Sequence, residues 1–423
     1  MSHPTDKPAI LGGKPAVTLD ARQANRWPII TAEDEAAVLE VLRDGELSLH
    51  PVTRALEEDY RRYFGVRHAL AHCNGTAALL AAFFSLDLKP GDEVLVPSAT
   101  FWASVVPMLW VGAVPVFCES ETARMGLDPQ DAACRITPRT RAMVVVHLWG
   151  MPSRMTELFD LARRRDLRII EDASHAAGAT WRGRKCGTLG DVSVISLQSA
   201  KLAPAGEGGM LLTDDDAIYE RAVCLGDIVR ILELPTPARR FAATSFGIKT
   251  RMAPLSAAVA RVQLRHMDER NARRNANLAY LSAGLESLGF ETFRPPPHVQ
   301  RVYFEFMVRV DPARCPLPVD RLVAALRAEG CDVQAPRYPL LHQQPLFTEG
   351  HAAALLRAGI GDRAAPTYLA NALPRTVAAN GQLIRLPSFP SATRPLLDQY
   401  VEAFRKVCDH ADEVAAAGGA TTP

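Results

Sequence analysis

The sequence lacks the features that mark membrane, secreted and nucleic-acid-binding proteins. Its 48 Lys and Arg residues almost balance 47 Asp and Glu, so the formal charge of +1 provides no basic field for nucleic acid. The N-terminal residues show no basic start followed by an apolar run, so we expect no secretory signal. The most apolar stretch, Ser104 to Phe117, is too short for a membrane span and contains two prolines and a glycine. We expect a cytoplasmic protein without membrane or nucleic-acid partners.

The cysteines also show no recognisable pattern. None of the eight belongs to a C-x-x-C pair, and no set of His and Cys residues has the spacing of metal ligands. We interpret them as buried free thiols, in preference to a disulfide framework, and predict no metal site.

Short apolar runs alternate with helical stretches between Asn74 and Thr213. The runs carry Val, Ile and Leu at both odd and even positions, which is typical of strands buried on both faces of a parallel or mixed sheet. We therefore predict an α/β fold, with a large parallel or mixed sheet covered by helices. Its strands are predicted at Glu93 to Pro97, Val114 to Cys118, Ala142 to Val146, Arg168 to Glu171, Val192 to Leu197 and Gly209 to Thr213.

Two segments outside this region have distinct local signals. Thr31 with Asp34 three residues later resembles a capping box and predicts an early helix to about Arg43. Between Asp227 and Gly247 the periodicity fades and two prolines occur, so we expect a long surface loop.

The C-terminal part predicts a second, smaller domain. Few helix breakers occur from Leu255 to Leu288, which predicts a long helix that connects two domains. We expect a large domain over residues 1–254 and a small α/β domain over residues 255–423. The small domain is predicted to contain a strand within Val302 to Val310 and helices at Val319 to Glu329 and Leu396 to Val414.

A turn of small residues at Cys73 to Ala78 precedes an apolar helical stretch. Free backbone N–H groups at a helix N-terminus favour an anion, and Gly75 would let a phosphate approach the chain closely, next to Thr76. The alternative is a plain N-cap by Asn74.

A second feature is the apolar strand that ends in Glu171, Asp172 and, three residues later, His175. Ligands of open α/β sheets lie at the carboxyl ends of strands, so Asp172 lies where a carboxylate could meet a cationic ring nitrogen. The alternative is that Asp172 only caps a following helix.

The third feature is Lys201, which follows a predicted strand and precedes a glycine-rich return. No other charged residue stands between Asp191 and Glu207. A lysine amine is a nucleophile toward carbonyl groups when its surroundings lower its pKa. Most lysines are solvated surface charges, and this is the alternative for Lys201 taken alone.

Together these features suit pyridoxal phosphate. That cofactor needs a lysine for its aldehyde, a carboxylate for its ring nitrogen, an anion site for its phosphate and a flat group over its ring. The chain offers Lys201, Asp172, the turn at Gly75 and Thr76, and Phe101.

On these motifs the chain resembles the DegT/DnrJ/EryC1/StrS aminotransferases, which act mainly on keto sugars and ketocyclitols. The resemblance covers most of the chain and implies the type I fold of pyridoxal-phosphate-dependent transferases. It rests on NGTAAL from Asn74, GDEVLVPSATF from Gly91, EDASHAAGA from Glu171, SLQSAKLAPAGEGG from Ser196, and KTRM from Lys249.

The resemblance implies a role for each residue around the cofactor ring. Lys201 lies at the position of the family's lysine that holds the cofactor as an imine. Asp172 matches the aspartate that pairs with the ring nitrogen, and His175 the residue beside the ring near its phenolic oxygen. Phe101 matches the aromatic residue that stacks on the ring, with Trp102 as the other candidate.

The resemblance also implies a set of phosphate ligands, with one departure. Ser196 and Gln198 match polar residues near the phosphate, and Gly75 and Thr76 match the backbone cradle. The family's usual asparagine, which reaches the phosphate of the neighbouring subunit, is replaced by Lys249. This lysine could bind that phosphate as a point charge or face the substrate instead.

The function that the resemblance implies is transamination with ping-pong kinetics, from glutamine or glutamate to a keto sugar or ketocyclitol in aminosugar or secondary-metabolite biosynthesis. The opening LGGKPA is more similar to members that aminate cyclitols. The family also implies a homodimer with shared active sites, with the segment from 227 to 250 as the place of exchange, and His342 is a candidate acceptor contact.

Two alternatives stay open. One is a pyridoxal-phosphate-dependent dehydratase or lyase, although the family's dehydratases carry histidine at the position of Lys201. The other is a pyridoxal-phosphate-binding regulatory protein without catalysis.

Overall fold

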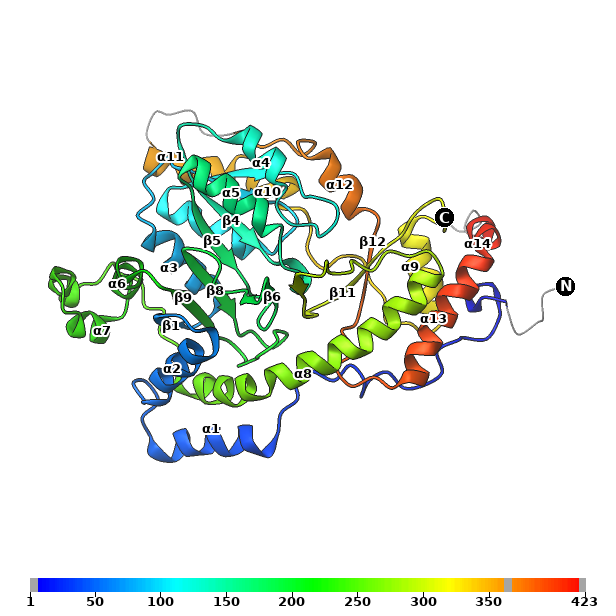
Figure 1. Ribbon diagram of the computed structural model, residues 1–423, viewed down its shortest axis with the longest axis horizontal. Coiled ribbons are helices and arrows are strands. Elements are labelled where there is room, and N and C mark those ends of the chain that lie inside the picture. Colours follow the sequence, from blue (N-terminus) through cyan, green and yellow to red (C-terminus); the bar gives the residue numbers. More distant parts are fainter. Residues whose placement is uncertain (1–6, 361–366, 418–423) are drawn as a thin grey trace.

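A seven-stranded sheet forms the centre of the computed structural model, which describes residues 7–360 and 367–417 (Figure 1). The strands follow the order β1-β9-β8-β5-β4-β2-β3. Strand β9 is antiparallel to both neighbours, and the remaining pairs are parallel. The bounds are β1 (His68–His72), β2 (Glu93–Pro97), β3 (Val114–Cys118), β4 (Thr140–Val146), β5 (Arg168–Asp172), β8 (Val192–Ser196) and β9 (Gly209–Thr213).

All six strands expected from apolar runs are confirmed at nearly the predicted bounds. Strand β1 was not predicted, since its sequence HALAH begins and ends with histidine. His72 is nevertheless buried, because its Nδ1 lies 2.9 Å from the hydroxyl of Thr250. A polar side chain can occupy a core strand when it has a hydrogen-bond partner there, and the local sequence does not reveal a partner that lies far away in the chain.

Helices cover both faces of the sheet. Helix α3 (Gly75–Ser85) packs on β8 and β9, and α2 (Val52–Phe64) packs on β1. The other helices of this part are α4 (Pro129–Arg135), α5 (Met155–Arg165) and α6 (Asp216–Cys224), with α10 (Pro345–Thr348), α11 (His351–Ile360) and α12 (Pro374–Asn380) from the C-terminal half. Short elements complete this part: β6 (Thr180–Trp181), β7 (Arg184–Lys185), β10 (Val299–Gln300) and the 3₁₀ helices η2 (Trp102–Ser104), η3 (Val106–Val111), η4 (Leu148–Gly150) and η6 (Leu341–Gln343). The 3₁₀ helix η1 (Ala9–Leu11) packs instead against α9 (Val319–Ala328).

The predicted long helix is confirmed as α8 (Pro254–Ser287), which runs below the sheet toward the second group of elements (Figure 1). The early helix is also confirmed as α1 (Ala32–Asp44), and it packs along α8. Its capping box forms, since the Thr31 side chain accepts from the backbone of Asp34 and Oδ2 of the Asp34 carboxylate accepts from the Thr31 N–H at 2.8 Å. The other oxygen of Asp34 accepts from Gln263 on α8 at 2.8 Å, which fixes α1 to that helix.

A second core lies at the other end of α8. It combines the antiparallel pair β11 (Phe306–Arg309) and β12 (Leu383–Leu386) with α9 (Val319–Ala328), α13 (Arg394–Asp409) and α14 (Ala411–Ala417). The two cores do not divide the chain at one point. Val17 and Ala24 pack in the second core, whereas Leu340 and Phe347 pack in the first. The domain bounds at residues 254 and 255 stay a prediction.

The prediction of a long loop between Asp227 and Gly247 is wrong. The segment forms α7 (Ile228–Glu233) and the 3₁₀ helix η5 (Pro237–Ala243), at the outer end of the molecule (Figure 1). Asp227 caps α7 by accepting from the N–H of Arg230, and the Arg230 guanidinium pairs with Glu57 at 2.5 Å. These two helices are too short for their apolar residues to show a helical periodicity in the sequence. The N-cap of Asp227 and the ion pair of Arg230 with Glu57 stabilise the segment, and neither is visible as a sequence period.

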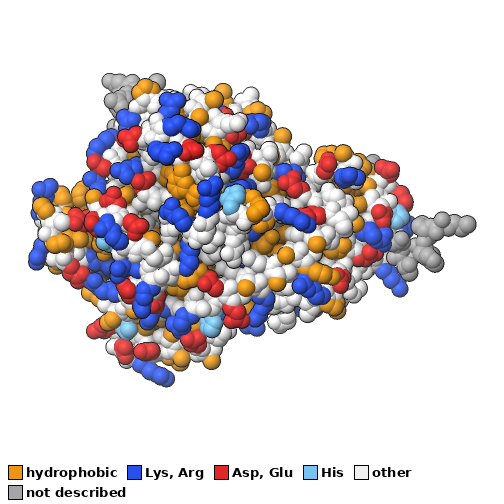
Figure 2. All heavy atoms as spheres, in the orientation of Figure 1, with side chains coloured by type: hydrophobic (Ala, Val, Ile, Leu, Met, Phe, Trp, Pro, Cys, Tyr) orange, Lys and Arg blue, Asp and Glu red, His pale blue; other side chains and the backbone are white. Residues whose placement is uncertain are grey.

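Figure 2 shows Lys and Arg side chains interspersed with Asp and Glu over the visible face. Among the described residues, no helix is both long enough and apolar enough to cross a bilayer.

A buried ion pair fixes the N-terminal segment to the second core. The carboxylate of Glu329 is fully buried, accepts from the backbone of Ala9 and Ala16, and lies 2.8 Å from Nζ of Lys406.

Lys406→Met would leave this carboxylate without a counter-charge, and we expect a loss of about 3 kcal/mol in the free energy of unfolding. Thermal unfolding measures the loss, with Arg273→Met as control. Arg273 belongs to an exposed pair with Glu269, so its loss should change stability little. Equal melting temperatures for the two variants would contradict the role of Lys406.

Candidate active site

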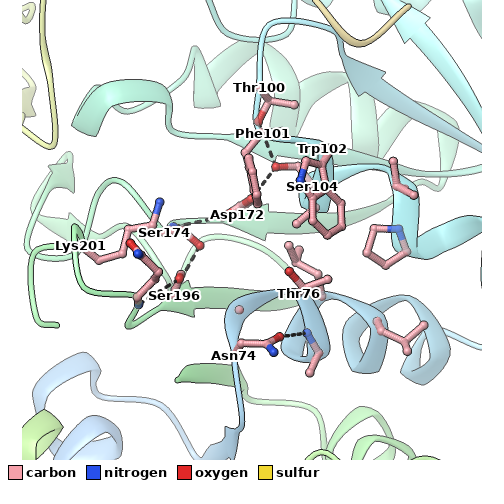
Figure 3. Close-up of a pocket in the computed structure, with 18 of the residues that line it drawn as sticks. Asn74, Thr76, Thr100, Phe101, Trp102, Ser104, Asp172, Ser174, Ser196 and Lys201 are labelled. Carbon is pink, nitrogen blue, oxygen red and sulfur yellow. Dashed lines mark hydrogen bonds between the residues drawn. The ribbon is translucent and has the colours of Figure 1, made fainter. Parts of the chain in front are cut away.

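The carboxyl ends of β1, β2, β5 and β8 open on one cavity of about 870 Å³. Because these strands point the same way, the residues that follow them meet at one edge of the sheet. The turn after β1 contributes Thr76, the segment after β2 contributes Phe101, β5 ends at Asp172, and Lys201 follows β8 (Figure 3).

Eight of the nine predicted site residues line this cavity, namely Gly75, Thr76, Phe101, Asp172, His175, Ser196, Gln198 and Lys201. Lys249 does not line it. Its side chain is exposed, although its neighbours Ile248 and Thr250 both reach the cavity wall.

Lys201 is held in a buried turn and is not a solvated surface residue. Its side chain is 9% exposed, and Nζ lies 4.3 Å from the ring centre of Phe304. The backbone N–H of Lys201 donates to the carbonyl of Gln198 at 2.8 Å, and the backbone carbonyl of Lys201 accepts from the indole of Trp27 at 3.1 Å. Burial lowers the pKa of Lys201 to about 8, although the nearby negative charge of Asp172 opposes this shift.

Asp172 is oriented toward the cavity by hydroxyl and backbone donors. Ser104 donates to Oδ2 at 2.6 Å, and the N–H of Ser174 donates to Oδ1 at 3.1 Å. The Ser104 hydroxyl is itself 2.9 Å from that of Thr100 (Figure 3). No helix follows β5 directly, since the next element is β6, so the interpretation of Asp172 as a helix cap is wrong.

The neighbouring Glu171 points to the opposite side of β5, where it holds adjacent segments together through hydrogen bonds. Its carboxylate accepts from Nε2 of His147 and from the hydroxyl of Ser193, both at 2.8 Å, and from the backbone of Leu189. His147 and Glu171 lie close to Cys186 in a group whose polar atoms are within 4.8 Å of one another. Because the backbone N–H of Ser153 already donates to the free ring nitrogen of His147, this histidine offers no open lone pair to a metal.

The N-terminus of α3 forms a cradle in the cavity floor. Asn74 caps the helix by accepting from the N–H of Ala77 at 2.8 Å, so the capping interpretation is confirmed. The cap and an anion site do not exclude each other, because Gly75, Thr76 and Ala77 of the same turn line the cavity. A Cβ on Gly75 would lie 2.8 Å from Cβ of Ser196, so the close approach requires glycine.

His175 lies in an aromatic stack on one wall. Its ring is parallel to Phe304 at 4.1 Å and to Tyr338 at 5.8 Å. The N–H of Trp149 donates to Nδ1 at 3.3 Å, which places the ring proton on Nε2, 3.3 Å from the hydroxyl of Tyr338. Burial, with the charge of Lys201, holds the pKa of His175 well below its usual value, so the ring is neutral.

Several residues of the site escaped sequence analysis. Phe304, Arg337 and Tyr338 line the cavity from segments far from the carboxyl ends of the central strands, and Trp27 contacts the Lys201 turn from the N-terminal segment. Ser104 follows β2, but no local motif marks it. His342, a candidate acceptor contact, is instead 1% exposed and bonded through Nδ1 to the Ser98 hydroxyl at 2.7 Å. It is absent from the cavity wall.

The fold and the buried lysine site define an α/β enzyme of the aminotransferase class. A model of the DegT/DnrJ/EryC1/StrS aminotransferase family matches residues 28–405, and the chain belongs to this family. It is an aminotransferase whose homologues act on sugars and cyclitols.

Two curated relatives and one solved structure illustrate the similarity. A protein of Streptoalloteichus tenebrarius named "Putative L-glutamine:3-amino-2,3-dideoxy-scyllo-inosose aminotransferase" is 32% identical over 96% of this chain and 99% of its own. The dTDP-3-amino-3,4,6-trideoxy-alpha-D-glucose transaminase of Streptomyces venezuelae is 34% identical over 91% of this chain and 94% of its own. The structure of DesI with its TDP-sugar product has a TM-score of 0.78 and 29% identity, and covers 98% of this chain and 99% of that one.

The burial of Lys201 predicts a titration that can be measured without substrate. In the cofactor-free protein its amine should titrate near pH 8 instead of the usual 10.5, because burial disfavours the ammonium form. Asp172→Asn removes a negative charge that stabilises the ammonium form, so it should lower the pKa of Lys201 further. The pH dependence of Lys201 acylation, followed by peptide mass spectrometry, gives both midpoints. A midpoint near 10.5, or a rise in the Asp172→Asn variant, would contradict this environment.

Proposed function

We propose that the protein is a pyridoxal-phosphate-dependent aminotransferase that moves an amino group from glutamine or glutamate to a keto sugar or ketocyclitol. The observation that carries the proposal is the buried amine of Lys201, with its lowered pKa, in one cavity with the oriented carboxylate of Asp172 and the N-terminus of α3. The setting is aminosugar or secondary-metabolite biosynthesis, and we infer a cytoplasmic location.

The residues around the cavity fit pyridoxal phosphate. The phosphate would lie against Gly75, Thr76 and Ser196, where a side chain at residue 75 would close the space. Gln198 lies next to Ser196 and donates its N–H to that hydroxyl at 3.3 Å. Phe101, 38% exposed on the cavity wall, would cover the ring.

Each polar group has a task that its surroundings support. When bound, pyridoxal phosphate supplies an aldehyde that takes up the amino group and a ring that accepts electrons. With a pKa of about 8, a large share of Lys201 amines is neutral at slightly alkaline pH and can take a proton from Cα of the donor. Asp172 would keep the ring nitrogen protonated, and neutral His175 would hold its place through the stack with Phe304. The keto acid leaves before the ketone binds, so the kinetics are ping-pong.

We infer a ketocyclitol as the first acceptor to test and a nucleotide-linked keto sugar as the second. The relative named for an aminodideoxy-scyllo-inosose matches almost the full length of both chains, and the transaminase named for a dTDP sugar matches nearly as much. The opening LGGKPA supports the cyclitol.

The proposed function is tested by measuring the two half-reactions separately, the release of keto acid from the donor and the amination of the ketone. Wild-type enzyme mixed with glutamine or glutamate alone should release a stoichiometric burst of keto acid, and a ketone from the acceptor panel should then be aminated. The panel contains scyllo-inosose and a dTDP-linked keto sugar. Lys201→Ala should lose both halves because no amine is left to move the proton, whereas exposed Lys89→Ala should retain them. Amination at the wild-type rate by Lys201→Ala would refute the mechanism, and a clear preference for the dTDP sugar would replace the cyclitol.

We also propose a homodimer in which Lys249 serves the site of the partner subunit. The exposed position of Lys249, beside two residues that line the cavity, supports a role across an interface. Large apolar side chains around the same mouth are exposed in the single chain, with Trp110 at 72% and Trp102 at 45%, and a second chain would cover them.

Subunit complementation tests the shared site. Lys201→Ala and Lys249→Ala are expected to be weak or inactive alone, since each lacks one required amine in every site. In mixed dimers one site has both lysines, so co-expression of the two variants should restore about a quarter of the wild-type activity. Activity no higher than the sum of the separate variants, or a fully active monomer in light scattering, would contradict the proposal.

A further inference from the structure

A second cavity of about 340 Å³ lies behind the active site. Gln198, Ala200, Phe304 and Arg337 line both cavities, so the two share a wall. The ring of Phe304, which lies 4.3 Å from Nζ of Lys201, is part of that wall. The second cavity therefore lies next to the cavity that holds the reacting amine.

Arg274 of α8 contributes a buried cation without a hydrogen-bond partner to this second cavity. Its side chain is fully buried, and neither Nε nor Nη1 has a partner among the described residues. The guanidinium carbon lies 3.8 Å over the ring of Trp27, which also walls the cavity. Burial lowers the pKa of Arg274 to about 9, so the charge is poorly compensated.

Arg270, one helical turn earlier on α8, shows how a structural arginine is satisfied at this place. Its guanidinium also lies over Trp27, at 5.7 Å, but it donates to the side chain of Gln263 and to the carbonyl of Ile29. Stacking on Trp27 therefore does not prevent hydrogen bonding. The unpaired N–H groups of Arg274 therefore result from the lack of acceptors around this side chain, and the stacking on Trp27 does not cause them.

The second cavity also holds an open acceptor. Glu305 is 3% exposed, and its Oε1 accepts from Arg337 at 2.5 Å and from Arg385 at 3.4 Å. Its Oε2 has no hydrogen-bond partner within residues 7–360 and 367–417. Glu305 thus compensates the two arginines at the rim of the cavity and leaves Arg274 unpaired. Asp332 is the other acid of the wall, and it is exposed and accepts from Gln334 at 3.3 Å.

We propose that this cavity binds the amino donor, with Arg274 as the ligand of its carboxylate and Oε2 of Glu305 as the acceptor for an N–H of its amide. A guanidinium is suited to this task because its parallel N–H groups match the two oxygens of a carboxylate. The proposal rests on the proposed function, since it assigns a place to the donor of that reaction. Glutamine carries the required carboxylate and an amide, and it keeps both when its α-amine is at the reacting centre.

The test uses a probe that cannot react. Glutaramate, the monoamide of glutaric acid, has the carboxylate and the amide of glutamine but no α-amine. Isothermal titration calorimetry should show that it binds the wild-type holoenzyme, and that Arg274→Met weakens binding by about tenfold or more, because a charge-assisted hydrogen bond is lost. Arg270→Met is the matched control and should bind glutaramate nearly as the wild type does. Glutaramide, which has no carboxylate, should bind the wild type weakly.

Thermal unfolding separates a binding defect from a folding defect. Arg274→Met keeps the apolar contact with Trp27 and removes a buried charge without partners, so its melting temperature should equal or exceed that of the wild type. Arg270→Met loses hydrogen bonds and should melt lower.

Absence of glutaramate binding to the wild type, or equal binding by Arg274→Met, would overturn the proposal. Failure of the proposed function would look different. Glutaramate would still bind in an Arg274-dependent way, while glutamine released no keto acid.

Discussion

The active site depends on one costly placement, the burial of the Lys201 amine beside Asp172. An ordinary lysine pKa of 10.5 falls to about 8 here, which corresponds to a folding cost of about 3 kcal/mol for the ammonium form. The cost applies in full below pH 8 and disappears as the pH rises above the pKa of the unfolded chain. Asp172 reduces the cost without cancelling it, so packing elsewhere must hold the lysine in place.

The N-terminal segment and α8 provide that support. The indole of Trp27 bonds to the carbonyl of Lys201, and its ring lies under the two arginines of α8. The same segment is tied to the second core through Glu329 and Lys406. Residues from both cores therefore hold the turn that carries the reactive amine, which places the site where the two cores meet.

Strand positions and the order of the motifs could be predicted because they depend on local patterns. Apolar runs located six strands, and the direction of parallel strands brought Gly75, Asp172 and Lys201 to one edge. The segment after Asp227 was mispredicted because its helices are short and depend on a cap and an ion pair to distant Glu57. Trp27, Phe304 and Tyr338 could not be predicted, since they reach the site only through packing.

The sequence alone determined the fold class, the family and the chemistry-bearing residues, because strand periodicity and motif order are properties of neighbouring residues. Only the tertiary structure decided their environment. It made Lys201 a buried amine, placed neutral His175 in an aromatic stack, and excluded His342 from the cavity. It also left Nε and Nη1 of Arg274 without partners among the described residues, in the cavity that shares a wall with the active site. Burial and hydrogen-bond partnership depend on residues far apart in the chain, and no local pattern encodes them.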